Sequence, residues 1–343
     1  MLAVKKEGVL LEKTGFNFES EGVLNPAAIS EGAFIHLFYR AVRKGNFSSI
    51  GYCMLKGPLV VAERHDTPLL VPEFKYESHG IEDPRITLID EVYFLTYTAY
   101  DGVNALGALA LSSDLVHFDK KGVIAPRISY EDFNRLVGPN CAINEKYMRY
   151  NENGHLAEKD GTKVVIWDKN VIFFPGRING KMYFIHRIKP DIQIASVTNL
   201  TELTPEFWNN YFQHFEEHIV LTAKYDHEVS YIGGGCPPIR TDAGWLLIYH
   251  GVHDTIDGYV YSACAALLDL EHPEKEIARL PYPLFQPDYS WEQVGEVNNV
   301  CFPTGSIVHT DNLYIYYGAA DEQIACTSVN LQQLINELLT NRL

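Results

Sequence analysis

The sequence predicts an all-β protein, and more specifically a five-bladed β-propeller. Three observations lead to this prediction: a hairpin pattern that recurs five times, further strand-like stretches behind each hairpin, and a spare strand near the N-terminus. A propeller closes such units into a ring, so few sheet edges stay exposed. We therefore expect a single propeller domain over residues 1–343.

Each hairpin pattern has two alternating apolar strands, with a proline near the start of the first and aromatic residues in the second. The pairs EG, DE, NG, AG and DN between the strands are turn chemistry. We expect each first strand to begin at its proline, because proline cannot donate to a sheet ladder. The five copies are NPAAISEGAFIHLFYR from Asn25, DPRITLIDEVYFLTY from Asp83, FPGRINGKMYFIHR from Phe174, PPIRTDAGWLLIYH from Pro237 and FPTGSIVHTDNLYIYYGAAD from Phe302.

A third strand rich in small residues follows every hairpin. These strands are SSIGYCMLK, NALGALALS, DIQIASVTN, YSACAALLD and EQIACTSVN. Four copies continue into a fourth strand, near PLLVP, GVIAP, HIVLTA and PLFQP. The fifth copy instead runs into a helical segment at about residues 330–341, and we expect EGVLLEK near the N-terminus to supply its missing strand.

One interval between hairpins is longer than the others. The stretch between Pro84 and Pro175 carries extra polar and charged residues, which we assign to an insertion at about 128–166. Loops of this length are usually functional or disordered.

Composition excludes several classes of function. The formal net charge of −16 argues against binding to nucleic acid or to an anionic membrane. No stretch approaches 18 uninterrupted apolar residues, and we expect a cytoplasmic protein. The six cysteines are scattered without metal-ligand spacing, so we expect reduced structural cysteines, no metal and no bound cofactor.

Hairpin geometry predicts where the candidate functional side chains lie. The residue that opens the first strand lies beside the residue that closes the second, so Asp83 should neighbour Tyr97. In a propeller, all five such pairs meet at one mouth of the central channel. Asparagine, arginine, histidine and aromatic residues at the same mouth are typical of a polar small-molecule site, although an Asp-Pro pair can also simply cap a turn.

Three basic residues also stand at hairpin ends. Lys169 precedes the third hairpin, Arg187 ends it, and His250 ends the fourth. Singly they could be a loop residue, a surface ion-pair partner and a core histidine. Together they would form a positive corner suited to a phosphate dianion. An acid facing this corner across a sugar-sized pocket suggests protonation of a leaving group while phosphate attacks the opposite face, with inversion.

Several motifs in order along the chain together resemble glycoside hydrolase family 130, the β-mannoside phosphorylases and related β-mannosidases. They are GIEDPRIT, NVIFFPGRINGKMYFIHR, IGGGCPPIRTDAGWLLIYHG, SACAALLDLEHP, VCFPTG and YYGAAD. The resemblance implies the same five-bladed propeller.

The resemblance also implies roles for individual residues. Asp83 matches the general acid, which in that family passes its proton through the 3-hydroxyl of mannose. Lys169, Arg187 and His250 match the phosphate ligands. The matching sugar contacts are Asn25, Arg40, Tyr261, Phe302 and Asp321, and the rim position adds Tyr97.

Two departures from the family pattern bear on phosphate binding and on the acceptor. Lys169 and Asn170 stand where arginine and aspartate are common, and lysine loses the bidentate geometry of arginine. The insertion at about 128–166 has no counterpart in the simplest members and could reshape the acceptor side.

These patterns leave three functions open. The first is a phosphorylase that cleaves a terminal β-mannoside with inorganic phosphate as co-substrate, giving α-mannose 1-phosphate and a shortened sugar. The second is an inverting β-mannosidase in which Glu228 or another rim acid activates water. The third is a propeller that only binds glycans or a protein partner, since fold alone does not give function. The linkage, the acceptor sugar and a possible homo-oligomeric state stay open.

Overall fold

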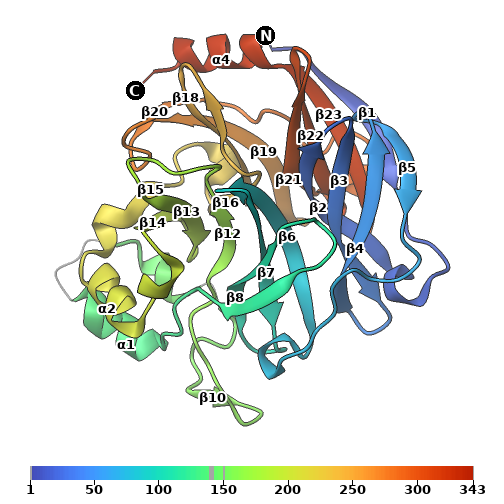
Figure 1. Cartoon of the computed structure of the whole chain (residues 1–343). Coiled ribbons are helices and arrows are strands. Elements are labelled where there is room, and N and C mark those ends of the chain that lie inside the picture. Colours follow the sequence, from blue (N-terminus) through green and yellow to red (C-terminus); the bar gives the residue numbers. More distant parts are fainter. Residues whose placement is uncertain (1, 139–142, 150, 343) are drawn as a thin grey trace.

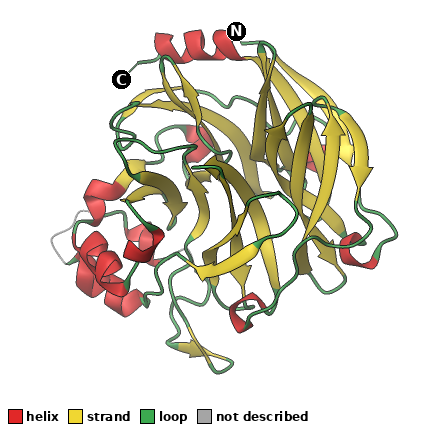
Figure 2. Cartoon of the chain, viewed as in Figure 1, coloured by secondary structure: helices red, strands yellow, loops and turns green. Residues whose placement is uncertain are grey.

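The computed structural model describes residues 2–138, 143–149 and 151–342. The described chain is built mainly of strands with few helices, which confirms the all-β prediction (Figures 1 and 2). No described helix is long and apolar enough to cross a membrane. The five described cysteines are free and buried, whereas Cys141 lies outside the described residues.

The strands form five antiparallel units in chain order. The first unit contains β2 (Gly22–Glu31), β3 (Phe34–Arg43), β4 (Phe47–Lys56) and β5 (Val60–Arg64). The second contains β6 (Gly80–Ile89), β7 (Val92–Tyr100), β8 (Ala105–Ser112) and β9 (Asp119–Val123). The third contains β12 (Lys169–Phe173), β13 (Met182–Arg187), β14 (Ile192–Val197) and β15 (Ile219–Leu221). The fourth contains β16 (Tyr231–Gly234), β17 (Ile239–Thr241), β18 (Gly244–Thr255), β19 (Gly258–Leu268) and β20 (Glu276–Arg279).

The fifth unit joins the two ends of the chain. It contains β21 (Cys301–His309), β22 (Asn312–Ala319), β23 (Gln323–Asn330) and β1 (Val4–Leu11). β1 pairs antiparallel with β23, as expected from the spare N-terminal strand. Helix α4 (Leu331–Thr340) follows directly and buries Leu334, Ile335 and Leu338, so the N-terminal and C-terminal segments lie on the same side of the molecule (Figure 1).

Each unit contacts the next one in the chain. The first strand of the second unit, β6, packs beside both β2 and β12, and β16 packs beside β12. β21 of the fifth unit contacts β18 and β19 on one side and β2 of the first unit on the other. A single parallel bridge between Ser48 and Gly80 links the first two units into one sheet.

The expectation that the strands begin at the prolines was wrong. Pro26 and Pro84 lie inside β2 and β6, at bulges where the register shifts between Leu24 and Ala27 and between Glu82 and Arg85. A bulge leaves its extra residue unpaired, so a proline that lacks an N–H is tolerated there.

The bulges also impose an unusual backbone on polar residues. Asn25, Asp83 and Asn170 have φ angles of 51°, 51° and 53°. Asparagine and aspartate are the residues other than glycine that adopt this left-handed conformation most readily. Three neighbouring units thus place a short polar side chain at the same point of their first strand.

A buried acid supports the second strand of every unit. In four units a glutamate from a short helix accepts a hydrogen bond from a tyrosine on the second strand and pairs with a cation on the outermost strand. These sets are Glu19 with Tyr39 and Arg64, Glu77 with Tyr97 and Lys120, Glu228 with Tyr249 and Arg279, and Glu292 with Tyr317 and Lys6. In the third unit Asp168 contacts His186 at 2.8 Å, and His186 contacts the Tyr211 hydroxyl at 2.8 Å. We call these five sets the buried triads.

Removing one triad hydrogen bond is expected to destabilise the fold. Tyr249→Phe leaves the fully buried Glu228 carboxylate without its phenol donor, so we expect the free energy of unfolding to fall by about 1 to 3 kcal/mol. Urea denaturation measures the loss. The matched control Tyr259→Phe changes an exposed tyrosine and should stay within about 0.5 kcal/mol of the parent, and equal values for the two variants would contradict the structural role of the triad.

The predicted insertion packs onto the third unit. It contains helix α1 (Tyr130–Val137), a short 3₁₀ helix (Glu145–Met148) and the two-residue strands β10 (Glu158–Lys159) and β11 (Thr162–Lys163). α1 lies beside helix α2 (Pro205–Gln213), where Phe133 contacts Phe212 edge to face (Figure 1). Residues 139–142 and 150 of this segment lie outside the described residues.

Candidate active site

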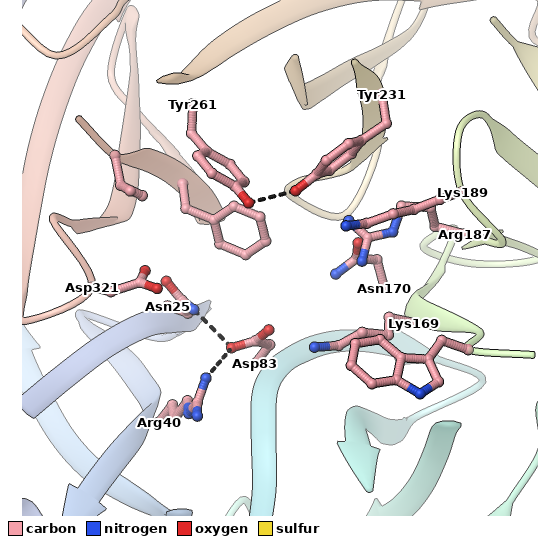
Figure 3. Close-up of a pocket in the computed structure, with 13 residues that line it drawn as sticks. Asn25, Arg40, Asp83, Lys169, Asn170, Arg187, Lys189, Tyr231, Tyr261 and Asp321 are labelled. Carbon is pink, nitrogen blue, oxygen red and sulfur yellow. Dashed lines mark hydrogen bonds and ion pairs between the residues drawn. The ribbon is translucent and has the colours of Figure 1, made fainter. Parts of the chain in front are cut away.

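A polar cavity of about 160 Å³ lies where the first strands of the units come together. Asp83 and Asn25 reach it from β6 and β2, and Lys169 and Arg187 reach it from the third unit (Figure 3). The cavity is lined by Asn25, Arg40, Asp83, Trp167, Lys169, Asn170, Arg187, Lys189, Tyr231, Tyr261, Val300, Phe302 and Asp321. Eight of the ten residues predicted from the sequence are in this set, and His250 and Tyr97 are not.

Asp83 is the central carboxylate of the cavity. It is buried, and its Oδ1 accepts a hydrogen bond from Asn25 Nδ2 at 2.7 Å and lies 3.8 Å from Arg40 Nη1 (Figure 3). Its neighbour Arg85 donates to the backbone oxygen of Asp83 at 2.9 Å, which fixes the bulge from behind. The carboxylate is therefore held in one orientation by its own strand and by the first unit.

Positive charges control the protonation of Asp83. Burial alone would raise the pKa of its carboxyl, but Lys169, Arg40 and Arg85 outweigh burial and hold the pKa below its ordinary value. The buried Glu82 connects two of these cations, since it lies 2.8 Å from Arg40 Nη2 and 3.5 Å from Lys169 Nζ. Asp83 is thus an ionised carboxylate within a network of charges.

Three basic side chains lie opposite Asp83. Lys169, Arg187 and Lys189 line the same side of the cavity, together with Asn170 (Figure 3). The guanidinium of Arg187 is buried and lies over the ring of Tyr231, 5.6 Å from its centre. Such a group of cations in an acidic protein is suited to a small anion.

His250 lies behind this cationic side and does not line the cavity. It is fully buried, and its Nε2 accepts a hydrogen bond from Arg187 Nη1 at 3.3 Å. Burial, followed by the charges of Arg187 and Arg85, holds the pKa of His250 well below its ordinary value. His250 is therefore a neutral acceptor that orients Arg187, which corrects the prediction of direct contact.

Tyr97 also lies outside the cavity lining. It stands across from the Asp83 bulge as expected, since its neighbours Thr96 and Thr98 pair with Arg85 and Glu82. Its side chain points into the core, however, where the hydroxyl donates to Glu77 at 2.7 Å as part of a buried triad. At the bulge both Asp83 and Pro84 lie opposite Tyr97, so the side chains of Asp83 and Tyr97 do not share a face as they would in a regular pair.

Aromatic side chains form another wall. The hydroxyls of Tyr231 and Tyr261 contact each other (Figure 3). Phe302 packs beside His250 with ring centres 4.5 Å apart. Tyr261 lines the cavity, whereas Tyr259 on the same strand is largely exposed. Rings of this kind offer flat apolar faces beside the polar groups.

Asp321 is the second carboxylate that lines the cavity. Burial is the main influence on it and, despite the opposing charge of Arg40, raises its pKa to about 6. Its φ angle is 51°, so it occupies a backbone conformation that asparagine would also adopt. The fold thus holds a carboxylate here at the expense of stability.

The substitution Asp321→Asn is expected to stabilise the protein at neutral pH. A carboxyl whose pKa is higher in the folded than in the unfolded state destabilises the fold once pH rises above the unfolded value, by about 3 kcal/mol above pH 6 in this case. The melting temperature should rise by roughly 3 to 6 °C at pH 7. The gain should shrink between pH 6 and pH 4, and an equal gain at pH 4 would contradict this explanation.

The sequence reasoning missed five residues that line the cavity: Trp167, Asn170, Lys189, Tyr231 and Val300. Asn170 was noted only as a departure from a motif. Lys189 had a visible signal, because it is a further basic residue two positions after Arg187. The Glu228 carboxylate, suggested as an alternative base, is fully buried in a triad and does not line the cavity.

Comparisons with known proteins find similar chains. The family model described as beta-1,4-mannooligosaccharide phosphorylase, Glyco_hydro_130, matches residues 12–340. A 1,2-beta-oligomannan phosphorylase of Thermoanaerobacter sp. (strain X514) is 32% identical over 338 residues, which cover 95% of this chain and 96% of that protein. A beta-1,2-mannobiose phosphorylase of the same organism is 34% identical, covering 92% of this chain and 93% of that protein.

A solved structure has the same fold. It is a beta-1,2-mannobiose phosphorylase from Listeria innocua in complex with beta-1,2-mannobiose, with a TM-score of 0.74 and 22% identity. The match covers 99% of this chain and all of that chain.

Proposed function

Since the chain belongs to glycoside hydrolase family 130, a family of carbohydrate-active enzymes, we propose that it cleaves a terminal β-mannoside with inorganic phosphate and inverts the anomeric centre. The products are α-mannose 1-phosphate and a sugar shortened by one residue. The observation that carries this proposal is the position of the Asp83 carboxylate, which faces Lys169, Arg187 and Lys189 across one cavity.

The two sides of the cavity divide the reaction between them. Phosphate binds at the cationic side, and one of its oxygens forms the new bond to the anomeric carbon. The bond from that carbon to the bridging oxygen breaks, and Asp83 supplies the proton that this oxygen needs. Attack and departure on opposite faces of the sugar give inversion.

Phosphate binding also favours the protonated form of Asp83. In the empty cavity Lys169 and Arg40 keep Asp83 ionised, which is the wrong state for a proton donor. A phosphate dianion beside Lys169 offsets this positive field and adds a like charge near the carboxylate, and both effects raise the pKa of Asp83. Asp83 therefore takes up its proton after phosphate has bound, which ties the acid to the presence of the nucleophile.

The remaining lining residues hold the mannose. Asn25, Arg40 and Asp321 supply hydrogen-bonding groups, and Phe302 and Tyr261 supply apolar faces. We propose β-1,2-linked manno-oligosaccharides as the first substrates, because two relatives matched over more than nine-tenths of the chain have that linkage in their names. No cofactor other than the co-substrate phosphate is required.

We also propose that the five units are the blades of a propeller. The support is the order of contacts, in which each unit packs against the next and β21 of the fifth packs against β2 of the first. The pairing of β1 with β23 would then close the ring.

Product analysis tests the proposed reaction. The chain is incubated with β-1,2-, β-1,3- and β-1,4-mannobiose, each with and without phosphate, and mannose 1-phosphate is separated from free mannose. We expect mannose 1-phosphate that forms only with phosphate. Release of free mannose without phosphate would instead identify an inverting β-mannosidase. If no β-mannoside is cleaved, the result would favour a protein that only binds its ligand.

A further inference from the structure

Lys189 is the third basic residue that lines the cavity. It lies two residues beyond the end of β13, and its Nζ is 3.7 Å from the centre of the Tyr231 ring. It lines the cavity with Lys169 and Arg187, so three basic side chains face the same space (Figure 3). A ring face compensates only part of the desolvation of an ammonium.

The polar groups around Lys189 are arranged for an occupant. Arg187 Nε is buried and has no hydrogen-bond partner within the described part of the chain. Both amide atoms of Asn170, which is 4% exposed, are likewise without a partner there. Buried donors are normally satisfied. The Nε of Arg187 and the Nδ2 of Asn170 can therefore donate to an anion with several acceptor oxygens.

The surroundings of Lys189 disfavour its positive charge. Burial is the main reason that its pKa lies well below the ordinary value, and the charges of Arg187 and Lys169 lower it further. The other titratable groups around it are His250, which is neutral, Tyr231, and Tyr130 and Tyr147 from the segment with α1.

We propose that Lys189 is a further ligand of the phosphate and that it gains a proton as the phosphate enters the cavity. This inference rests on the proposed phosphorolysis and adds a residue and a proton to it. A dianion beside Lys169 and Arg187 offsets their positive field at the Lys189 amine and favours its charged form. Lys189 is then protonated only when phosphate binds, so the protein does not have to keep a third positive charge buried beforehand.

Two substitutions test the role of Lys189. Lys189→Met keeps the length of the side chain and removes the charge, and Lys189→Arg keeps a charge that does not titrate. We expect Lys189→Met to raise KM for phosphate at least 30-fold while KM for mannobiose changes less than 3-fold. Lys189→Arg should recover most of the phosphate affinity. Lys181→Met, an exposed lysine in a turn, is the matched control and should leave both constants unchanged.

Calorimetry tests the proton. Sulfate replaces phosphate as the probe, since its charge stays constant between pH 6 and 9, and its binding enthalpy is measured in buffers of different ionisation enthalpy. We perform the comparison in an Asp83→Asn background, so that protons taken up by Asp83 do not contribute. The background protein should take up protons as sulfate binds at pH 8, and adding Lys189→Met or Lys189→Arg should abolish the uptake.

The outcomes separate this inference from the proposed function. An unchanged KM for phosphate in Lys189→Met, with mannose 1-phosphate still formed, would overturn the role of Lys189 and leave phosphorolysis intact. Unchanged proton uptake would overturn the titration. A parent enzyme that releases mannose without phosphate would overturn the proposed function itself. A merely structural lysine would alter stability without altering proton uptake.

Discussion

Replacing Asp83 with asparagine is expected to lower kcat by about 10³-fold, within the range of a positioned general acid. Asparagine keeps the oxygen that accepts from Asn25 and tolerates the φ angle of 51°, so the bulge should persist. It has no proton to donate, which leaves the departing oxygen without an acid. Initial rates of mannose 1-phosphate release measure the effect.

The control for this variant is Asp90→Asn. Asp90 also has a positive φ angle, 49°, but it is an exposed turn residue that pairs with Arg177 outside the cavity. Its kcat should match the parent. If Asp83→Asn retained more than a tenth of the parent rate while its thermal unfolding stayed cooperative, Asp83 could not be the acid.

Replacing Arg187 with alanine is expected to raise KM for phosphate by about 10² to 10³-fold. Truncating one partner of a buried, hydrogen-bonded charge pair has an effect of roughly 2 to 5 kcal/mol. The guanidinium is buried, and its Nε has no described partner that competes with a phosphate oxygen. Because Arg187 lies on the side of the cavity away from Asp321 and Asn25, KM for the sugar should change far less (Figure 3).

Arg177→Ala provides the comparison, since Arg177 lies near the exposed hairpin turn of the same unit. Steady-state kinetics with phosphate and mannobiose varied independently give both constants. An equal rise in the two constants for Arg187→Ala would argue against a phosphate ligand and for a general disturbance of the cavity.

The sequence was sufficient for the all-β fold and for most of the cavity. The repeated hairpins identified the second strand of each unit, and Arg40 and Arg187 could be located from strand ends alone. Asp83 could be identified because its proline fixed a special point of the strand. These predictions depended on chain order and turn chemistry, which are local properties.

Side-chain direction was the part that the sequence did not determine. Tyr97 and His250 were assigned to the cavity from their places on the second strands, but the Tyr97 hydroxyl donates to Glu77 and His250 accepts from Arg187 behind the cavity lining. Lys189 lies past the end of β13, where alternation no longer applies. Its place depends on how the third and fourth units pack, which no local pattern encodes.

The buried triads bear on how such a cavity can diversify. Four units use a tyrosine and one uses a histidine as the central triad member, while the residue after it is Arg40, Thr98, Arg187, His250 and Gly318 in the five units. The supporting layer is thus nearly uniform, and the adjoining position accepts a cation, a hydroxyl, an imidazole or no side chain at all. A substitution at this position in one unit can therefore change the chemistry of the site while the five buried triads stay the same.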